Sequence, residues 1–274
     1  MAADLDIAIP TFARPEALAV TLATLAMQTA PDFRVIVSDQ TEQQSAFTAP
    51  VVQTPLRLLR ARGHEVILRT HLPRRGLAEH RQFLLDASGG RYILFLDDDL
   101  LLEPFVVDQM RKAIGELDCG FVGSAVHGLS FVDDHRPHEE AVEFWDRQVE
   151  PETVVPDSPQ WRRHLLHNAA NLLHVQRRLA VRPEDPRPYR VAWVGGCVLY
   201  DVARLRDSGG FDFWRNLPRE HSGEDVLAQL RVMARYGGCG LLPSGVYHQE
   251  LPTTVTDRTV DAPFALPEAL ASTR

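Results

Sequence analysis

The stretch "YILFLDDDLL", from Tyr92 to Leu101, places five apolar residues directly before three aspartates, after which apolar residues resume. A short uninterrupted apolar run is typical of a strand that is buried on both faces of a parallel sheet. Ligands of such sheets bind outside the carboxyl ends of the strands. The three aspartates therefore stand at the edge of the sheet where a ligand is expected.

The residues on either side of this stretch alternate between strand and helix patterns. The predicted strands are 5–10, 33–39, 65–70 and 91–96, and the predicted helices are 14–28 and 76–90. Pro15 suits the first turn of the first helix, and Gly89 and Gly90 suit the end of the second. This alternation predicts an α/β fold with a Rossmann-like, mostly parallel central sheet that helices cover on both faces.

The second half of the chain shows weaker patterns. Its predicted elements are a helix around 162–179, a strand-like stretch at 189–200, a helix at 223–238 and a final strand within 239–248. Residues 133–190 carry many prolines, acidic residues and histidines, and we interpret them as an insertion. Residues 249–274 contain three prolines and little periodicity, which indicates a C-terminal tail or a lid.

Composition excludes several classes of protein. The chain has 274 residues and a formal charge of −8, which argues against nucleic acid or an anionic membrane surface as the main partner. No apolar run is long enough to predict a membrane span, and the acidic start lacks the basic region of a signal peptide. The three cysteines are far apart and odd in number, so we expect buried thiols in a reduced, cytoplasmic protein. Nothing indicates the oligomeric state.

The three aspartates need a partner for their charge. In an extended segment Asp97 and Asp99 point the same way, so they can converge on one point. Two carboxylates ~6 Å apart repel by about 3 kcal/mol at an effective dielectric constant of 20. A divalent cation, Mn²⁺ or Mg²⁺, would offset this repulsion and keep positions open for substrate phosphates. The alternative is a solvated acidic turn before the next helix.

Five segments, in this order along the chain, resemble the family 2 glycosyltransferases of the GT-A fold. The segments are "IPTFARPEAL", "VIVSDQTE", "RGLAEHRQFLLDASGGRYILFLDDDL", "VGGCVLYDVARLRDSGGFD" and "SGEDVLAQLR". The resemblance runs from about Asp6 to Tyr236 and breaks in the insertion at 133–190. It implies a metal-dependent, inverting transfer of a sugar from a UDP- or dTDP-sugar to an acceptor hydroxyl.

The resemblance also implies different roles for the two halves of the chain. Residues 1–101 would form the half that binds the nucleotide sugar, and residues 102–248 the half of the same domain that binds the acceptor and carries out catalysis. The nucleotide-sugar contacts carried over by position are Pro10, Phe12, Asp39, Arg81 and Asp98, and Arg14 and Asp97 are further candidates. Among these, Asp39 would accept a hydrogen bond from the pyrimidine base, and Asp98 would contact the ribose. Arg75 could bind phosphate, with a solvated helix face as the alternative. Gly195 and Gly196 could let the backbone approach the donor sugar, with a β-bulge as the alternative.

The remaining roles concern metal, catalysis and acceptor. Asp99, together with Asp97 and His248, would hold the metal, which suits the mixed ligand preferences of Mn²⁺. Asp225 would be the general base and Glu224 a ligand of the acceptor hydroxyl; the alternative is that both are ordinary acids of a first helical turn. Trp193 and Trp214 are candidates to contact the acceptor, with core packing as the alternative.

Some positions depart from the family pattern. Phe12 stands where tyrosine is usual, and Gln40 and Thr41 stand where glycine and serine are usual. No departure removes a carboxylate, so these changes bear on which base and sugar are bound. The histidines of the insertion, such as His164 and His167, have no HExxH partner and predict no zinc site. A nucleotidyltransferase of related fold and a catalytically silent nucleotide-sugar-binding protein are the alternative functions.

Overall fold

The computed structural model describes residues 3–30 and 32–271, and the last three residues of the predicted tail lie outside it. Its central sheet has eight strands within these residues, in the order β3-β2-β1-β4-β9-β6-β10-β8. They are β1 (Leu5–Thr11), β2 (Arg34–Asp39), β3 (Glu65–Thr70), β4 (Tyr92–Leu96), β6 (Phe121–Gly123), β8 (Arg187–Tyr189), β9 (Cys197–Asp201) and β10 (Gly238–Leu242). Only β8 and β9 run antiparallel to their neighbours. The predicted mostly parallel α/β sheet is confirmed.

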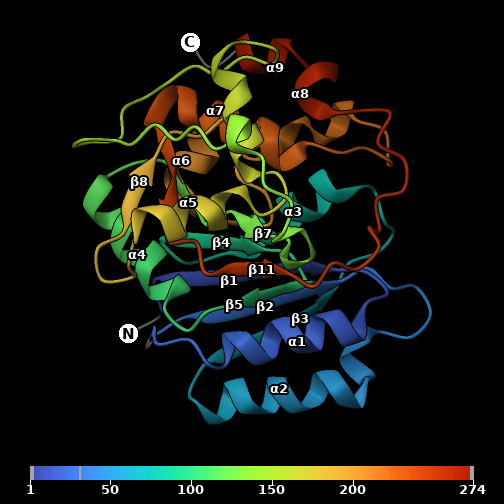
Figure 1. Cartoon of the computed structure of the whole chain (residues 1–274). Coiled ribbons are helices and arrows are strands. Elements are labelled where there is room, and N and C mark those ends of the chain that lie inside the picture. Colours follow the sequence, from blue (N-terminus) through green and yellow to red (C-terminus); the bar gives the residue numbers. More distant parts are fainter. Residues whose placement is uncertain (1–2, 31, 272–274) are drawn as a thin grey trace.

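Helices cover both faces of the sheet (Figure 1). The described helices are α1 (Pro15–Leu25), α2 (Pro50–Ala61), α3 (Leu77–Ala87), α4 (Val106–Leu117), α5 (Asn171–Leu179), α6 (Val202–Asp207), α7 (Glu224–Tyr236), α8 (Ala262–Ala265) and α9 (Glu268–Ala271). The apolar residues of α1, α2 and α4 form one core cluster with the sheet, and those of α3, α6 and α7 form the other. None of these helices is long and apolar enough to cross a bilayer.

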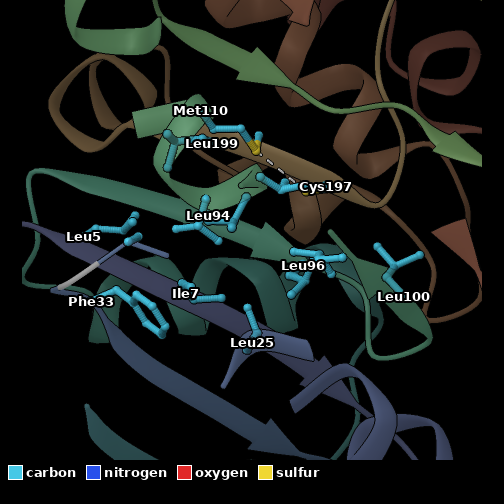
Figure 2. Packing of buried hydrophobic residues seen from close by; sticks show 14 of the residues in the cluster. Leu5, Ile7, Leu25, Phe33, Leu94, Leu96, Leu100, Met110, Cys197 and Leu199 are labelled. Atoms are coloured by element: carbon cyan, nitrogen blue, oxygen red, sulfur yellow. Dashed lines mark hydrogen bonds between the residues drawn. The ribbon is translucent and has the colours of Figure 1, made fainter. Parts of the chain in front are cut away.

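The first core cluster shows why the apolar runs become strands. Leu5 and Ile7 of β1 and Leu94 of β4 are almost wholly buried and meet Leu25 of α1. Figure 2 shows these side chains as one apolar layer, with Cys197 beside Met110. Cys197 and the other two cysteines are buried and free, as their spacing predicted. Burial of apolar area on both faces is the main stabilisation of such strands.

A second, three-stranded sheet consists of β5 (Leu100–Leu102), β11 (Val246–His248) and β7 (Val126–His127). β11 pairs antiparallel with β5, and this register sets His248 opposite Leu100. The backbone N–H of Gln249 then donates to the carbonyl of Asp99 at 2.9 Å. This small sheet therefore brings the end of the final strand beside the aspartates that follow β4.

Three local predictions need correction. Helix α2 lies between the second and third strands, where the sequence pattern predicts no helix. The helix expected at 162–179 is divided into a 3₁₀ segment, Gln160–His167, and α5, because Ala169 between them adopts a left-handed φ of 49°. The other 3₁₀ segments are Ala46–Thr48, Leu129–Phe131, Pro137–Glu139 and Asp212–Asn216.

The strand-like stretch 189–200 is also interrupted. It contributes the end of β8 and most of β9, and irregular backbone lies between them. There the side-chain amide of Gln229 replaces a strand partner: it accepts from Val194 N–H at 2.8 Å and donates to the Val194 carbonyl at 2.8 Å. Gly196 turns the chain with a φ of 75°. This segment therefore reaches the carboxyl edge of the sheet as a loop.

A buried acid stabilises the opposite edge of the sheet. Asp6 of β1 is fully buried and accepts two hydrogen bonds from Arg34, at 2.7 and 2.8 Å. Ser88 Oγ and the backbone N–H groups of Gly89 and Gly90 donate to the same carboxylate. Burial alone would raise the pKa of Asp6, but these hydrogen bonds outweigh it and hold the pKa below its ordinary value.

Replacing this acid should be costly. Asp6→Asn should lower the free energy of unfolding at pH 7 by about 3 kcal/mol, because Arg34 loses its anion in a buried site. Since the folded pKa is lowered, the stabilisation is present above about pH 4 and is lost as the pH falls through the folded value. Urea denaturation between pH 3 and pH 7 measures this difference.

The matched control is Asp108→Asn, which breaks the exposed pair between Asp108 and Lys112. This change should alter stability by no more than about 0.5 kcal/mol. Equal stability of the Asp6→Asn variant and the unmodified protein at pH 7 would contradict the structural role of Asp6.

Candidate active site

A cavity of about 700 Å³ opens at the carboxyl edge of the sheet. Its walls come from segments that are far apart in the sequence. They include the end of β1 and the following loop, the start of α3, the turn after β4, the start of α7, the end of β11 and the C-terminal segment up to Asp261. Both predicted halves of the chain and the predicted tail therefore contribute to one cavity.

Most of the predicted site residues line this cavity. Those that do are Pro10, Phe12, Arg14, Arg81, Asp97, Asp98, Asp99, Trp193, Gly195, Gly196, Glu224, Asp225 and His248. Three predicted residues, Asp39, Arg75 and Trp214, are not among the lining residues. Arg74, the neighbour of Arg75, lines the cavity instead, with its guanidinium 3.6 Å from the centre of the Phe12 ring.

Asp39 is engaged by its own loop. The carboxylate is fully buried and accepts hydrogen bonds from Thr41 N–H, Thr41 Oγ1, Ser45 Oγ and Ala46 N–H, all between 2.6 and 2.9 Å. These four contacts occupy both carboxylate oxygens. The neighbouring Gln40 lies at the cavity, and its buried Nε2 has no hydrogen-bond partner among the described residues. Asp39 thus shapes the loop, and its contact with a base stays a prediction.

The three aspartates line the cavity, but Asp97 pairs with a different arginine from Asp98 and Asp99. Asp98 and Asp99 lie in a turn, so the alternation expected of an extended segment does not apply. Asp97 Oδ1 accepts from Arg81 at 3.0 Å, whereas Asp99 Oδ2 accepts from Arg14 at 2.7 Å. Asp98 accepts from Thr11 Oγ1 at 2.6 Å, and its other oxygen lies 3.5 Å from Arg14. Two arginines therefore share the charge of the triad.

The environment of Asp97 and Asp98 disfavours their ionisation. Burial raises the pKa of Asp98 to about 7; the hydrogen bond from Thr11 opposes this rise, and the neighbouring Asp99 adds to it. Burial also raises the pKa of Asp97, against the attraction of Arg81. An additional cation at this edge would therefore stabilise the ionised aspartates.

Arg81 forms ion pairs with acids on two different elements of the site. Its guanidinium, with only 5% of the side chain exposed, donates to Asp97 after β4 and to Glu224 Oε1 at the start of α7, each at 3.0 Å. Burial lowers the pKa of Arg81, but Asp97 and Glu224 more than compensate, so the pKa lies above its ordinary value. Arg81 is thus a permanent cation between the aspartate turn and helix α7.

Asp225 follows Glu224 and keeps its carboxylate at the cavity. Gly223 precedes the pair in a left-handed conformation with a φ of 73°, which turns the chain into α7. Burial and the adjacent Glu224 raise the pKa of Asp225 to about 7, although Arg81 opposes them. A carboxylate that titrates near neutral pH is suited to take up a proton during a reaction.

The predicted metal ligands lie partly together. His248 Nε2 is 3.5 Å from Asp99 Oδ2, because β11 and β5 pair beside the aspartate turn. Asp97 faces Arg81 instead, and its role as a ligand stays a prediction. Within residues 3–30 and 32–271, no group of three or more histidine, cysteine, aspartate or glutamate side chains forms a metal site.

The structure adds residues that the sequence did not single out. Thr11 holds Asp98, Arg74 covers Phe12, and Trp161 lies in the cavity wall. The C-terminal segment crosses the cavity, where Arg14 also donates to the carbonyl of Pro252. A polar residue at the end of a predicted strand could have indicated Thr11. No pattern in the insertion distinguished Trp161.

The sequence matches one known family over most of this site. The model of glycosyl transferase family 2 matches residues 6–172, which is more than half of the chain. The chain belongs to glycosyl transferase family 2. This membership favours the predicted sugar transfer over the nucleotidyltransferase alternative. The match ends before Glu224 and Asp225, so their roles remain predictions. No curated protein sequence matches the chain.

Solved glycosyltransferase structures share the fold. Residues 1–349 of S. aureus TarS superpose with a TM-score of 0.58 at 15% identity, over 98% of this chain and 64% of that one. The same segment in complex with UDP-GlcNAc gives a TM-score of 0.57 at 16% identity, over 92% and 60%. The mannosyltransferase PcManGT from Pyrobaculum calidifontis, in complex with GDP-Man and Mn²⁺, gives 0.56 at 14% identity, over 100% and 73%. These neighbours confirm the GT-A fold, and this chain spans less than two thirds of the TarS segment.

The buried arginine of this family 2 protein is a direct test of the site geometry. Arg81→Met should lower the free energy of unfolding by about 3 to 5 kcal/mol, because Glu224 would remain buried without its cation. Arg75→Met changes an exposed arginine six residues before Arg81 and should alter stability by no more than about 0.5 kcal/mol. Urea denaturation compares the two variants, and equal losses would show that the bridge does not stabilise the fold.

Proposed function

We propose that this family 2 protein is a metal-dependent, inverting glycosyltransferase that moves a sugar from a UDP- or dTDP-sugar to an acceptor hydroxyl. One observation carries the proposal: Arg81 links Asp97 to Glu224, so that the aspartate turn and Asp225 face the same cavity. A donor at the aspartates and an acceptor at Asp225 would therefore meet inside one site.

Asp99 and His248 are of the donor types that Mn²⁺ accepts, and Asp99 Oδ2 lies 3.5 Å from His248 Nε2. Asp99 Oδ2 also accepts from Arg14 at 2.7 Å, and Glu250 N–H donates to His248 Nδ1 at 2.6 Å, so a bound cation would replace the Arg14 contact and the proton on His248 Nε2. With two protein ligands, the other positions are left for water and the donor diphosphate, as is usual for such ions. When bound, the metal supplies Lewis-acid stabilisation of the leaving diphosphate. The neighbour PcManGT was solved with Mn²⁺, and this supports the same requirement here.

The protein's own residues position the donor. Phe12 and Pro10 form one wall for the base, and Arg74 covers the Phe12 ring. Gly195 and Gly196 allow the backbone to approach the donor sugar closely. Arg14 contacts Asp98 and Asp99 and is placed to meet the diphosphate at the same edge. TarS, solved with UDP-GlcNAc, supports a uridine donor for this chain.

Asp225 acts as the general base. Displacement at the anomeric carbon with inversion requires one base that takes the proton of the acceptor hydroxyl as the new bond forms. Arg81 hydrogen bonds to Glu224 and holds it in position to orient the acceptor, while Asp225 has a pKa of about 7 and receives the proton. The segment 249–261, which crosses the cavity, acts as a lid that excludes water.

Nucleotide binding should depend on metal. UDP should raise the melting temperature of the protein in the presence of Mn²⁺ but not in its absence, because Asp99 and His248 would hold the ion and the ion would neutralise charge on the diphosphate. His248→Ala should weaken this effect without changing the melting temperature of the unliganded protein by more than a few degrees. Differential scanning fluorimetry with UDP, dTDP and GDP measures it. Failure of every diphosphate to stabilise the protein with either Mn²⁺ or Mg²⁺ would refute the proposed donor.

Removal of the base should separate binding from turnover. Asp225→Asn should lower kcat by about 10²- to 10⁴-fold, because the amide cannot accept the proton. The metal-dependent stabilisation by UDP should remain. Donor consumption in a coupled assay measures turnover, and Asp212→Asn, an exposed acid outside the cavity lining, is the matched control. Unchanged turnover in the Asp225 variant would assign the base elsewhere.

The rate should follow the ionisation of this base. Only the ionised form of Asp225 accepts a proton, and its pKa lies at about 7, so kcat/KM should rise with pH and level off above about 7. Measuring kcat/KM between pH 5 and pH 9 at saturating Mn²⁺ tests this rise. A rate that is constant from pH 5 upward would contradict the assignment.

A further inference from the structure

The cavity has an aromatic wall that the proposed transfer chemistry does not use. Trp161 lies 5.9 Å from His164 and meets the edge of Phe264 at 5.9 Å, measured between ring centres. His164 stacks parallel to Trp193, with ring centres 6.2 Å apart and planes inclined by 9°. Three segments of the chain, the 3₁₀ turn at 160–167, the loop before β9 and helix α8, therefore build one surface.

Trp193 has a fixed position relative to the base. Gln229 of α7 holds the backbone of Val194 with two hydrogen bonds of 2.8 Å, and the same helix begins with Glu224 and Asp225. On the other side, Gly196 packs beside Asp97, since a Cβ atom at Gly196 would lie 3.4 Å from Asp97 Oδ2. The loop that carries Trp193 is thus hydrogen-bonded to the helix that begins with Glu224 and Asp225, and it lies next to the donor end of the cavity.

The wall offers both kinds of contact that a sugar ring needs. A pyranose has an apolar face of C–H groups and a rim of hydroxyl groups. Trp161 and Trp193 line the cavity and supply flat apolar surface for dispersion contacts. Glu224 and Asp225 can accept hydrogen bonds from hydroxyl groups.

The apolar surface near Trp161 and Trp193 includes further exposed side chains. Phe264 and Leu251 are exposed by 48% and 40%, and Leu251 lies at the cavity beside the C-terminal segment. Trp214, by contrast, does not line the cavity, and Arg215 covers its ring at 4.9 Å. Of the two tryptophans predicted to contact the acceptor, Trp193 lines the cavity and Trp214 does not.

We propose that Trp193, with Trp161 beside it, is the acceptor platform, and that the acceptor is a carbohydrate whose ring stacks on it with one hydroxyl directed at Asp225. The inference rests on the proposed function, because it assigns the second substrate of the same transfer. It names the class of acceptor, a pyranose-containing saccharide, from the chemistry of the wall.

The test measures sugar binding without donor. Saturation-transfer NMR of the full chain with methyl β-D-glucopyranoside, methyl β-D-galactopyranoside, N-acetylglucosamine and maltose should show transfer to the C–H protons of one ring face. Trp193→Ala should weaken binding of the best of these sugars about fivefold to tenfold, the usual worth of an aromatic contact. Trp193→Phe should lose about twofold, because the flat apolar face is kept. Trp214→Ala, the matched control, should bind as the unmodified protein does.

The outcomes separate the two proposals. Metal-dependent stabilisation of Trp193→Ala by UDP, equal to that of the unmodified protein, shows that the fold and the donor site are intact in this variant. If UDP and Mn²⁺ bind but none of the four sugars does, or if Trp193→Ala and Trp214→Ala bind equally, the carbohydrate platform is refuted and the transferase remains. Tighter binding of 1-hexanol or benzyl alcohol than of every sugar also refutes it, in favour of an apolar acceptor. If no nucleotide binds, the proposed function itself fails.

Discussion

The site depends on one buried ionic bridge. Arg81 of α3 contacts Asp97 at the end of β4 and Glu224 at the start of α7, and both distances are 3.0 Å. Removing one partner of such a bridge leaves an uncompensated charge in a medium of low dielectric. The bridge therefore fixes the position of helix α7 relative to the aspartate turn. It joins the two halves of a single cavity.

The arginines also explain how three consecutive acids can follow a buried strand. Arg81 forms an ion pair with Asp97. Arg14 forms an ion pair with Asp99 and lies 3.5 Å from Asp98, so two arginines together neutralise part of the charge of the three acids. The compensation is incomplete, since the pKa of Asp98 is raised to about 7. A divalent cation beside Asp99 and His248 would complete it. The two arginines thus stabilise part of the negative charge of the aspartates, and a bound cation would stabilise the rest.

Much of this arrangement could be predicted from the sequence. Apolar runs indicated β1 to β4 because burial on both faces leaves a continuous signal, and the order of motifs indicated the family. Other features could not be predicted. Arg74 and Arg75 are adjacent and chemically identical, and only the path of the loop decides which one faces Phe12. Trp161 lies in an insertion without a motif, and the four hydrogen bonds to Asp39 come from a loop whose turn had no distinctive spacing.

The sequence by itself determined the α/β class, the family and the edge of the sheet where the polar residues gather, because these depend on local periodicity and on short motifs. Tertiary structure alone decided which acid pairs with which arginine, that His248 stands beside Asp99 and Trp193 faces the cavity, and that Trp214 lies outside its lining. The reason is physical: such contacts join residues up to 149 positions apart, as His248 and Asp99 are, and their geometry is set by strand register and helix packing. No local pattern carries that information.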